Sequence, residues 1–366
     1  MSQKVTMIAP VPPFRGGIAH HSAALAGGLG TIPECELEIE SFQRLYPAFF
    51  YPGESPYDGT DPSSPARAGR FDLDVLNPLT WRTLARRIAD RSDVAVIPCW
   101  TFFAAPCLGW IARQLRKTGV EVVMLVHNVG DHEGAAWKNY LTHWQLAGAD
   151  RFVTHTPQLA SQLRAAGLNQ PCTIVPHPPY SDFPPATGSM PQEKALELLC
   201  FGLVRPYKGV DIALAGLAEA DLPDVRLTIA GEIWDGEDNL RRLANDPRLA
   251  GKVEFRNSYQ SDQDAADLFS RADALLLPYR TITGSGVLAM AQHYRLPVVA
   301  SDLPALEQPI ERDKLGWCFE TGDAAELAQL LKSEISRENC AALASEMAEP
   351  DVTGWNHMAS AVLDLP

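Results

Sequence analysis

A short loop rich in glycine follows an apolar run in the second half of the chain and has the composition of an anion-binding site. The run Ala274–Pro278 is typical of a strand, and the sequence from Val287 onward is typical of a helix start. Small residues let a ligand approach the backbone, and the N–H groups of a first helical turn lack intrahelical partners. We therefore expect an anion cradle, with a plain turn as the alternative. Its members would be Thr283, Gly284, Ser285, Gly286 and Val287.

Two cations stand three residues apart in the loop that follows another apolar run, Leu196–Phe201. The guanidinium of Arg205 can bind two phosphate oxygens at once, and the ammonium group of Lys208 adds a point charge. Together they would clamp a diphosphate, whereas the alternative is a solvated pair of surface charges. The next two strand-like runs are followed by further candidates for the same end of a sheet: Gly231, Glu232 and Tyr259.

The first half of the chain offers a second glycine loop and a histidine. Gly16 and Gly17 precede a helical pattern and favour an anion-binding turn, or else an ordinary tight turn between strand and helix. His127 directly follows the apolar run Val122–Val126, and we expect it to reach a ligand from the end of that strand. A structural, hydrogen-bonded histidine is the alternative. His155 also follows a strand-like run.

Metal chemistry is not predicted from the sequence. His132 and Glu133 are adjacent, but the chain lacks the second histidine of a metal-binding helix motif. His177 lies in a proline-rich stretch and is interpreted as structural. The seven cysteines are scattered without metal-ligand spacing, which is typical of reduced, packed thiols.

Composition narrows the class of protein. The chain has 366 residues, 46% of them apolar and 21% charged, which predicts a globular protein of two domains. A formal charge of −14 argues against nucleic-acid binding. No apolar run is long enough to span a membrane, and the N-terminus does not resemble a signal peptide, so a cytoplasmic protein is expected. A weak basic stripe would offer peripheral contact with a membrane, or else form a solvated helix face: Arg82, Arg86, Arg87 and Arg91.

Strand-like and helix-like segments alternate along the whole chain, and this pattern predicts parallel sheets covered by helices on both faces. A proline- and glycine-rich link interrupts the series after residue 175. We predict a first domain over residues 1–178, a linker over 179–195 and a second domain over 196–348. The remaining residues, 349–366, are expected to form a helix that packs back on the first domain. Residues 43–77 are interpreted as a long insertion, either a loop or a lid.

Ligands of such sheets bind at the carboxyl ends of the strands, so two facing sheets predict a ligand cleft between the domains. Three segments then resemble one known family. Pro12–Ala19 resembles the N-terminal Gly-Gly loop of the GT-B nucleotide-sugar glycosyltransferases, and Phe201–Asp211 resembles their phosphate-binding Arg/Lys loop. Ala272–Ser301 resembles their donor-sugar region. The three occur in the family's order across nearly the whole chain, which is similar to the family 4 retaining enzymes.

Two positions depart from the family pattern. The two glutamates that relatives usually carry, separated by seven residues, are replaced here by Ile282 and Met290. The arginine that usually follows the glycine of the phosphate loop is replaced by Leu203, and Arg205 stands two residues later. The resemblance therefore implies a divergent member, in which Glu307 is a candidate for a carboxylate supplied by a neighbouring loop.

The resemblance implies two doubly wound Rossmann-like domains facing across a cleft. It also implies transfer of a sugar from a nucleotide diphosphate sugar to a saccharide or lipid-linked saccharide, with retention of configuration, in bacterial polysaccharide or glycolipid biosynthesis. Neither a cofactor nor a divalent metal is expected, and the departing phosphate would take the acceptor proton. His127 would contact the donor sugar or the acceptor hydroxyl.

Two other classes remain as alternatives. A non-catalytic protein that binds nucleotide sugars or acts as a scaffold is one, because both usual glutamates are missing. A sugar-nucleotide epimerase of the same fold is the other, and it would need acid and base carboxylates, for which the sequence offers Asp131, Glu133 and Glu232.

Overall fold

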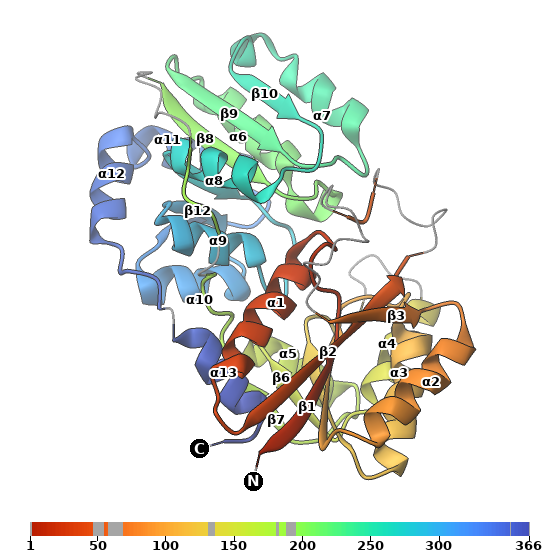
Figure 1. Ribbon diagram of the computed structural model, residues 1–366. Coiled ribbons are helices and arrows are strands. Elements are labelled where there is room, and N and C mark those ends of the chain that lie inside the picture. Colours follow the sequence, from red (N-terminus) through yellow and green to blue (C-terminus); the bar gives the residue numbers. More distant parts are fainter. Residues whose placement is uncertain are drawn as a thin grey trace. The chain divides into compact units, whose positions relative to one another are not determined.

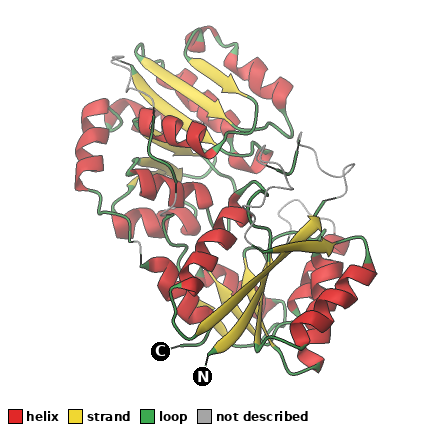
Figure 2. Cartoon of the chain, in the orientation of Figure 1, coloured by secondary structure: helices red, strands yellow, loops and turns green. Residues whose placement is uncertain are grey.

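The structure is a computed structural model that describes residues 2–46, 55–57, 69–130, 136–180, 183–187, 195–351 and 353–365. The chain forms two compact units. Unit 1 comprises Met1–Pro178 with Val352–Pro366, and unit 2 comprises Pro179–Asp351. Each unit has its own parallel sheet with helices on both faces, as Figure 2 shows for each unit separately. The predicted class, two doubly wound α/β domains, is confirmed.

Unit 1 contains a seven-stranded parallel sheet in the order β3-β2-β1-β4-β5-β6-β7. Its central strands are buried along most of their length, which explains why they read as apolar runs in the sequence. The strands are β1 (Gln3–Ile8), β2 (Cys35–Arg44), β3 (Arg70–Asp74), β4 (Val94–Cys99), β5 (Glu121–Val126), β6 (Arg151–Thr154) and β7 (Cys172–Ile174).

The helices of unit 1 are α1 (Gly17–Gly30), α2 (Pro78–Ala89), α3 (Ala105–Lys117), α4 (Ala136–Leu146), α5 (Pro157–Ala165) and α13 (Gly354–Val362). The last of these packs beside α1, so the two ends of the chain lie together in unit 1 (Figure 1). The contact is close, because a Cβ atom at Gly28 of α1 would lie 2.5 Å from the carbonyl oxygen of Trp355.

Unit 2 contains a six-stranded parallel sheet in the order β10-β9-β8-β11-β12-β13. Its strands are β8 (Leu196–Phe201), β9 (Val225–Ala230), β10 (Val253–Arg256), β11 (Ala274–Leu277), β12 (Val298–Ser301) and β13 (Gly316–Phe319). Its helices are α6 (Val210–Ala220), α7 (Glu237–Ala244), α8 (Asp262–Arg271), α9 (Gly286–Tyr294), α10 (Pro304–Asp313), α11 (Ala324–Ser333) and α12 (Arg337–Glu346), with short 3-10 helices η2 (Pro206–Lys208) and η3 (Pro247–Leu249).

The order of strands reverses direction once in each sheet, between β1 and β4 in unit 1 and between β8 and β11 in unit 2. Loops on either side of such a point leave the sheet in opposite directions, which opens a crevice at the carboxyl ends of the strands. In unit 2, the loops after β8 and β11 are the ones that carry the Arg/Lys pair and the glycine cradle.

One element was misread in the sequence. Residues 43–77 were expected to form a loop or lid, but β2 runs to Arg44 and Arg70–Asp74 forms β3 at the edge of the sheet. The sequence did not indicate this strand because its charged residues alternate with the apolar residues that face the core. The charged residues are Arg70, Asp72 and Asp74. Most of the remaining segment lies outside the described residues.

The basic stripe on α2 also needs a correction, because one member is not solvated. The Arg87 guanidinium binds the buried Glu40 carboxylate of β2 at 2.6 Å and the Asp72 carboxylate of β3 at 3.2 Å. It therefore ties α2 to the sheet. All seven cysteines are free thiols, as expected. In the part of the chain that the structure describes, no helix is long and apolar enough to cross a membrane.

Candidate active site

Lys208 ends the loop that follows β8 and is almost fully buried, with 8% of the residue exposed. Its ammonium group donates a hydrogen bond to the carbonyl oxygen of Phe201 at 3.1 Å and lies 5.4 Å from the centre of the Tyr279 ring. Burial, with a smaller contribution from the positive charge of Arg205, lowers the pKa of Lys208 to about 8. At neutral pH this lysine is still charged.

Gly202 marks the point where the predicted elements meet. A Cβ atom at Gly202 would lie 3.0 Å from Lys208 Nζ and 3.5 Å from the Val287 side chain. The glycine after β8, the buried lysine and the first turn of α9 therefore surround one position, at which a backbone without side chains lets a ligand approach.

The loop after β9 packs against the loop after β8. Gly231 has a φ of +138°, and a Cβ atom there would lie 2.3 Å from the carbonyl oxygen of Gly202, so a glycine is required. Val204 and Ile233 form a short parallel bridge beyond the strands. The loop carrying Arg205 is thus held by main-chain contacts of its neighbour.

Arg205 lies over an aromatic ring rather than over a carboxylate. Its guanidinium carbon is 4.8 Å from the centre of the Trp234 ring, and the Trp234 indole N–H donates to the Glu232 carboxylate at 3.1 Å. Among the described residues, neither Arg205 nor Lys208 forms an ion pair with an acidic side chain. Two neighbouring cations without a carboxylate partner favour binding of an external anion.

The cradle after β11 begins a helix, as predicted. Ser285 is the N-cap of α9, and its hydroxyl accepts a hydrogen bond from the Leu288 N–H at 3.2 Å. A Cβ atom at Gly284 would meet none of the described atoms within 4 Å, whereas one at Gly286 would lie 3.3 Å from the Tyr180 hydroxyl. Neither glycine has a positive φ, so a larger residue at either position would not strain the backbone. Thr283 is 5% exposed and faces the interior.

An ion pair fixes the loop after β11 relative to the Arg/Lys loop. The Arg280 guanidinium binds the Asp211 carboxylate of α6 at 2.6 Å and donates to the carbonyl oxygen of Pro206 at 2.9 Å. The backbone N–H of Arg280 also donates to the Tyr207 carbonyl oxygen at 2.7 Å. The geometry of Lys208 relative to α9 is therefore set by hydrogen bonds and not by packing alone.

The remaining candidates of unit 2 lie farther along the same edge of the sheet. Tyr259 follows β10, the edge strand, which is separated from β8 by β9. Glu307 lies in the first turn of α10, which follows β12. Both are partly exposed and stay candidates by position.

In unit 1, Gly16 is the N-cap of α1 with a φ of +98°, and a Cβ atom at Gly16 or Gly17 would meet nothing within 4 Å. His127 follows β5, and its backbone N–H donates to the Cys99 carbonyl oxygen at 3.0 Å. Asp131, His132 and Glu133 lie outside the described residues, so their predicted roles have no structural description.

Three further histidines, His21, His155 and His177, gather beside His127. The rings of His127 and His155 lie 4.6 Å and 5.0 Å from the ring of His21, and the ring of His177 lies 5.2 Å from it, measured between centroids. Burial lowers the pKa of His127 to about 3 and that of His177 to about 4, and the pKa values of His21 and His155 are also lowered well below 6.5. The four imidazoles are therefore neutral at physiological pH.

The sequence analysis missed this grouping, although a signal was present. His127 and His155 directly follow Val126 and Thr154, which are paired neighbours in the sheet. Equivalent positions after adjacent parallel strands lie side by side. His21 of α1 carried no such signal and was not singled out.

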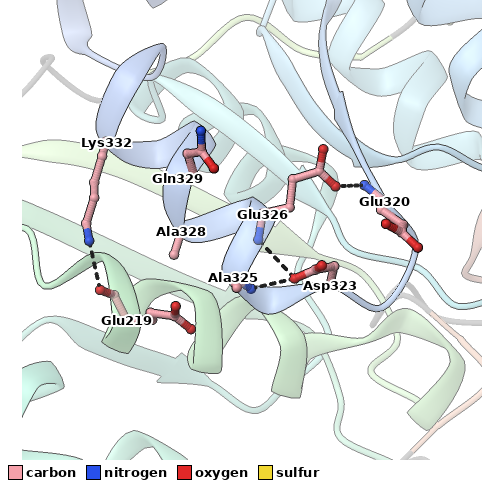
Figure 3. Close-up of a pocket in the computed structure, with 8 residues that line it drawn as sticks. All are labelled: Glu219, Glu320, Asp323, Ala325, Glu326, Ala328, Gln329 and Lys332. Atoms are coloured by element: carbon pink, nitrogen blue, oxygen red, sulfur yellow. Dashed lines mark hydrogen bonds between the residues drawn. The ribbon is translucent and has the colours of Figure 1, made fainter.

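An open pocket of about 570 Å³ lies elsewhere in unit 2 (Figure 3) and does not involve the Arg/Lys pair. Its acidic side chains are used locally, because Asp323 caps α11 and Glu326 accepts from the Glu320 N–H (Figure 3). Lys332 donates to the Glu219 carbonyl oxygen at 3.2 Å. A pocket lined by so many carboxylates repels a diphosphate, so we do not place the ligand there.

Comparison with known proteins identifies two matching family models. The model described as "Glycosyl transferase 4-like domain" matches residues 50–178, and the model described as "Glycosyl transferases group 1" matches residues 195–336. Together they cover most of both units.

The chain is also similar to individual known proteins and solved structures. A GDP-mannose:glycolipid 4-beta-D-mannosyltransferase of Xanthomonas campestris pv. campestris is 27% identical over 227 residues, which are 58% of this chain and 59% of that protein. A D-inositol 3-phosphate glycosyltransferase of Mycobacterium tuberculosis is 28% identical over 54% of this chain and 45% of its own length, so the chain spans only about half the length of these relatives. The structure of Anabaena HepE in complex with UDP and glucose has a TM-score of 0.71 at 16% identity, covering 99% of both chains.

Proposed function

The chain belongs to the group 1 glycosyltransferases of the GT-B fold, and we propose that it transfers a sugar from a nucleoside diphosphate sugar to a saccharide or lipid-linked saccharide. The observation that carries this proposal is the pair Arg205 and Lys208, two cations without an acidic partner among the described residues, beside the N-terminus of α9. Solved neighbours bound to UDP and glucose or to UDP-glucose agree with such a donor.

In the proposed reaction, the bond between the anomeric carbon and the diphosphate oxygen breaks while the acceptor oxygen bonds to the same carbon. Negative charge grows on the leaving diphosphate. Arg205, Lys208 and the N–H groups at the start of α9 would stabilise that charge more strongly in the transition state than in the ground state. The acceptor proton passes to the departing phosphate, and the configuration at the anomeric carbon is retained.

The proposed transfer works without the two usual glutamates, so backbone N–H groups and hydroxyl groups would bind the donor in their place. Met290, at one of the two positions, is 8% exposed and packs inside unit 2. Ser285 offers its hydroxyl hydrogen to a ligand while its oxygen caps α9. Glu307 is the carboxylate that we assign to the sugar, and Gly231, Glu232 and Tyr259 would lie along the nucleotide.

Unit 1 would bind the acceptor. His127, at the end of β5, would contact the acceptor hydroxyl, while Gly16 and Gly17 at the start of α1 stay candidates for donor binding. Peripheral membrane contact is supported by one face of α2 and the turn before it, where Leu76 is 53% and Leu79 is 71% exposed and Arg82 and Arg86 are also exposed. An apolar and basic helix face of this kind suits a lipid-linked acceptor.

Turnover separates the proposal from its two alternatives. Purified protein would be incubated with a panel of UDP- and GDP-sugars and with lipid-linked saccharide acceptors, and nucleoside diphosphate release would be measured. A transferase releases the nucleotide in proportion to product only when an acceptor is present. Interconversion of donors without acceptor would identify an epimerase, and tight donor binding without any turnover would identify a binding or scaffold protein.

Donor identity is best found first by thermal shift, because a bound donor raises stability in proportion to RT ln(1 + [L]/Kd). The donor site is proposed to act without a divalent metal, since Arg205 and Lys208 supply the positive charge. A transfer rate that rises on addition of Mg²⁺ or Mn²⁺ would contradict this part of the proposal.

A further inference from the structure

The histidine cluster of unit 1 is not explained by the donor site of unit 2. His21 lies in α1, His127 follows β5 and His155 follows β6, so three separate elements bring imidazoles to one place. The Trp355 ring of α13 covers the cluster, with its centre 5.0 Å from that of His21. Such convergence of basic side chains needs a physical reason, because each must be kept from water and from a proton.

His21 presents the clearest anomaly. The residue is 1% exposed, and within the part of the chain that the structure describes neither of its ring nitrogens has a hydrogen-bond partner. Buried polar atoms are almost always satisfied, since an unsatisfied one loses its hydration without compensation. An apolar side chain would fill the same space more favourably, so a lone pair aimed into the cluster indicates a missing ligand.

The spacing of the nitrogens fits a metal ion. One ligand nitrogen from each of His21, His127 and His155 lies within 4.8 Å of the other two. Tetrahedral zinc with Zn–N bonds of about 2.0–2.1 Å holds its nitrogens about 3.3 Å apart, which rotation of the rings can reach. We propose that His21, His127 and His155 bind a divalent transition metal ion, with zinc as the preferred occupant, and that this ion fastens α1 to the carboxyl ends of β5 and β6.

The neighbouring hydrogen bond supports this assignment. Nδ1 of His155 lies 3.1 Å from the carbonyl oxygen of Val175, so Nδ1 carries the proton and Nε2 keeps the lone pair. Ligating histidines commonly have their second nitrogen held by a carbonyl oxygen in this way, which fixes both tautomer and ring orientation. His177 is held similarly, with Nδ1 2.8 Å from the Pro178 carbonyl oxygen, and its ring lies 5.2 Å from that of His155.

Three neutral imidazoles select the type of metal. They suit Zn²⁺, Co²⁺ and Cu²⁺ and bind Mg²⁺ or Ca²⁺ poorly, because those ions prefer oxygen ligands. His127 is the member of the three with some exposed surface, whereas His21 and His155 are buried. The fourth position would be taken by water or hydroxide from that side.

The inference goes beyond the proposed sugar transfer, and it gives His127 a different contact from the sugar or acceptor. The two proposals fail separately. A requirement for Mg²⁺ or Mn²⁺ would count against the donor site in unit 2, whereas the histidine site is tested with Zn²⁺ and Co²⁺ in the absence of any sugar nucleotide.

The test uses the full chain with any affinity tag removed. Protein stripped with a chelator would be titrated with Co²⁺, whose visible bands report tetrahedral nitrogen ligands, and then with Zn²⁺ to displace it. We expect one equivalent bound, displacement at one equivalent of Zn²⁺, and a melting temperature that rises with free zinc. Absence of stoichiometric binding to the folded wild-type protein would overturn the proposal without need of any variant.

Variants assign the site. His21→Phe and His155→Gln should each weaken zinc binding by at least about 100-fold, more than the loss of an outer-shell partner costs. His357→Gln, an exposed histidine on α13, is the matched control and should bind one equivalent like the wild type. Undiminished binding by His21→Phe and His155→Gln would place the metal on surface histidines and overturn the assignment. If His21 is only a packing residue, His21→Phe should leave a zinc-dependent rise in melting temperature unchanged.

Discussion

The two sheets present opposite chemistry at equivalent places. At the carboxyl ends of β8 and β11, unit 2 gathers positive charge, with Arg205 and the buried Lys208 beside the start of α9. At the carboxyl ends of β5 and β6, unit 1 gathers neutral imidazoles, whose pKa values burial has lowered. One edge is prepared for an anion, and the other for lone-pair donation or hydrogen bonding.

The two edges differ in whether their buried basic side chains keep a positive charge. Lys208 keeps its charge because the Phe201 carbonyl oxygen accepts its hydrogen bond and the Tyr279 ring lies nearby. The histidines lose theirs, because burial disfavours the charged form of each ring and, to a smaller extent, the neighbouring rings disfavour a further proton. The same topology therefore supports two kinds of site, and the side chains that follow each strand decide which.

The largest effect should come from the cations of unit 2. Arg205→Ala and Lys208→Ala should each lose about 2–4 kcal/mol of transition-state stabilisation, which is about 30-fold to 900-fold in kcat/KM. Both should also weaken binding of free UDP or GDP, measured by calorimetry. Arg242→Ala, which removes an exposed arginine of α7 that donates to Asn239, is the control and should behave like the wild type.

The variant His127→Ala, in unit 1, tests the same comparison between the two units. If the diphosphate is held by unit 2 alone, this variant should bind free UDP or GDP with unchanged affinity while Lys208→Ala does not. Equal losses in both variants would mean that the two edges do not divide the work as proposed, and wild-type turnover in Arg205→Ala and Lys208→Ala would remove the donor site from unit 2.

The glycines of unit 2 should separate folding from binding. Gly231→Ala should cost about 1–3 kcal/mol of stability, because its Cβ atom would meet the Gly202 carbonyl oxygen at 2.3 Å with φ at +138°. Gly284→Val adds a side chain in open space at an ordinary φ, so it should leave the melting temperature nearly unchanged and weaken donor binding. Urea unfolding and donor affinity would be measured on both.

The result for Gly284→Val decides whether the loop after β11 binds the donor. A variant that is stable and binds donor normally would show that the segment from Thr283 to Gly286 is merely a turn. A loss of stability without any change in affinity would contradict the open space seen around Gly284.

Sequence reasoning reached the fold because the central strands are unbroken apolar runs that can only be buried parallel strands. It failed at β3, where Arg70 and Asp72 are exposed and Asp72 pairs with Arg87, while the buried Asp74 pairs with Arg44. An edge strand of this kind reads as a loop, since half of its residues meet water.

Candidate residues of unit 2 were predictable because each follows a strand, and parallel strands bring their ends together. What the sequence could not supply was contact across loops. The approach of Gly231 to Gly202, and the stacking of Arg205 on Trp234, depend on main-chain conformation that no local pattern encodes. The same holds for His21, whose helix turns it toward strands that lie about a hundred residues away.

The pH dependence should also differ between the two edges. Lys208 loses its proton as pH rises through about 8, so donor affinity should fall between pH 7 and pH 9.5, by up to about 30-fold. A bound diphosphate favours the charged form, so the fall begins at the pKa of the free protein and levels off at the higher pKa of the complex. Lys208→Arg keeps its charge across the range and should give a flatter profile, whereas parallel profiles for Lys208 and Lys208→Arg would contradict the assignment.

The smallest effect concerns two serines that do the same structural work in unit 2. Ser285 caps α9 and Ser261 caps α8, and each hydroxyl accepts from a backbone N–H at 3.2 Å. Replacing either by Ala should cost about 1 kcal/mol of stability, the usual loss at an N-cap. Only Ser285→Ala should also weaken donor binding, by about 1 kcal/mol for one lost hydroxyl hydrogen bond. Because the helix-capping loss is shared, the difference between the two variants in donor affinity measures what the cradle contributes as a ligand site. If calorimetry finds equal affinities, the hydroxyl of Ser285 does not touch the donor and the anion is held by backbone N–H groups with Arg205 and Lys208.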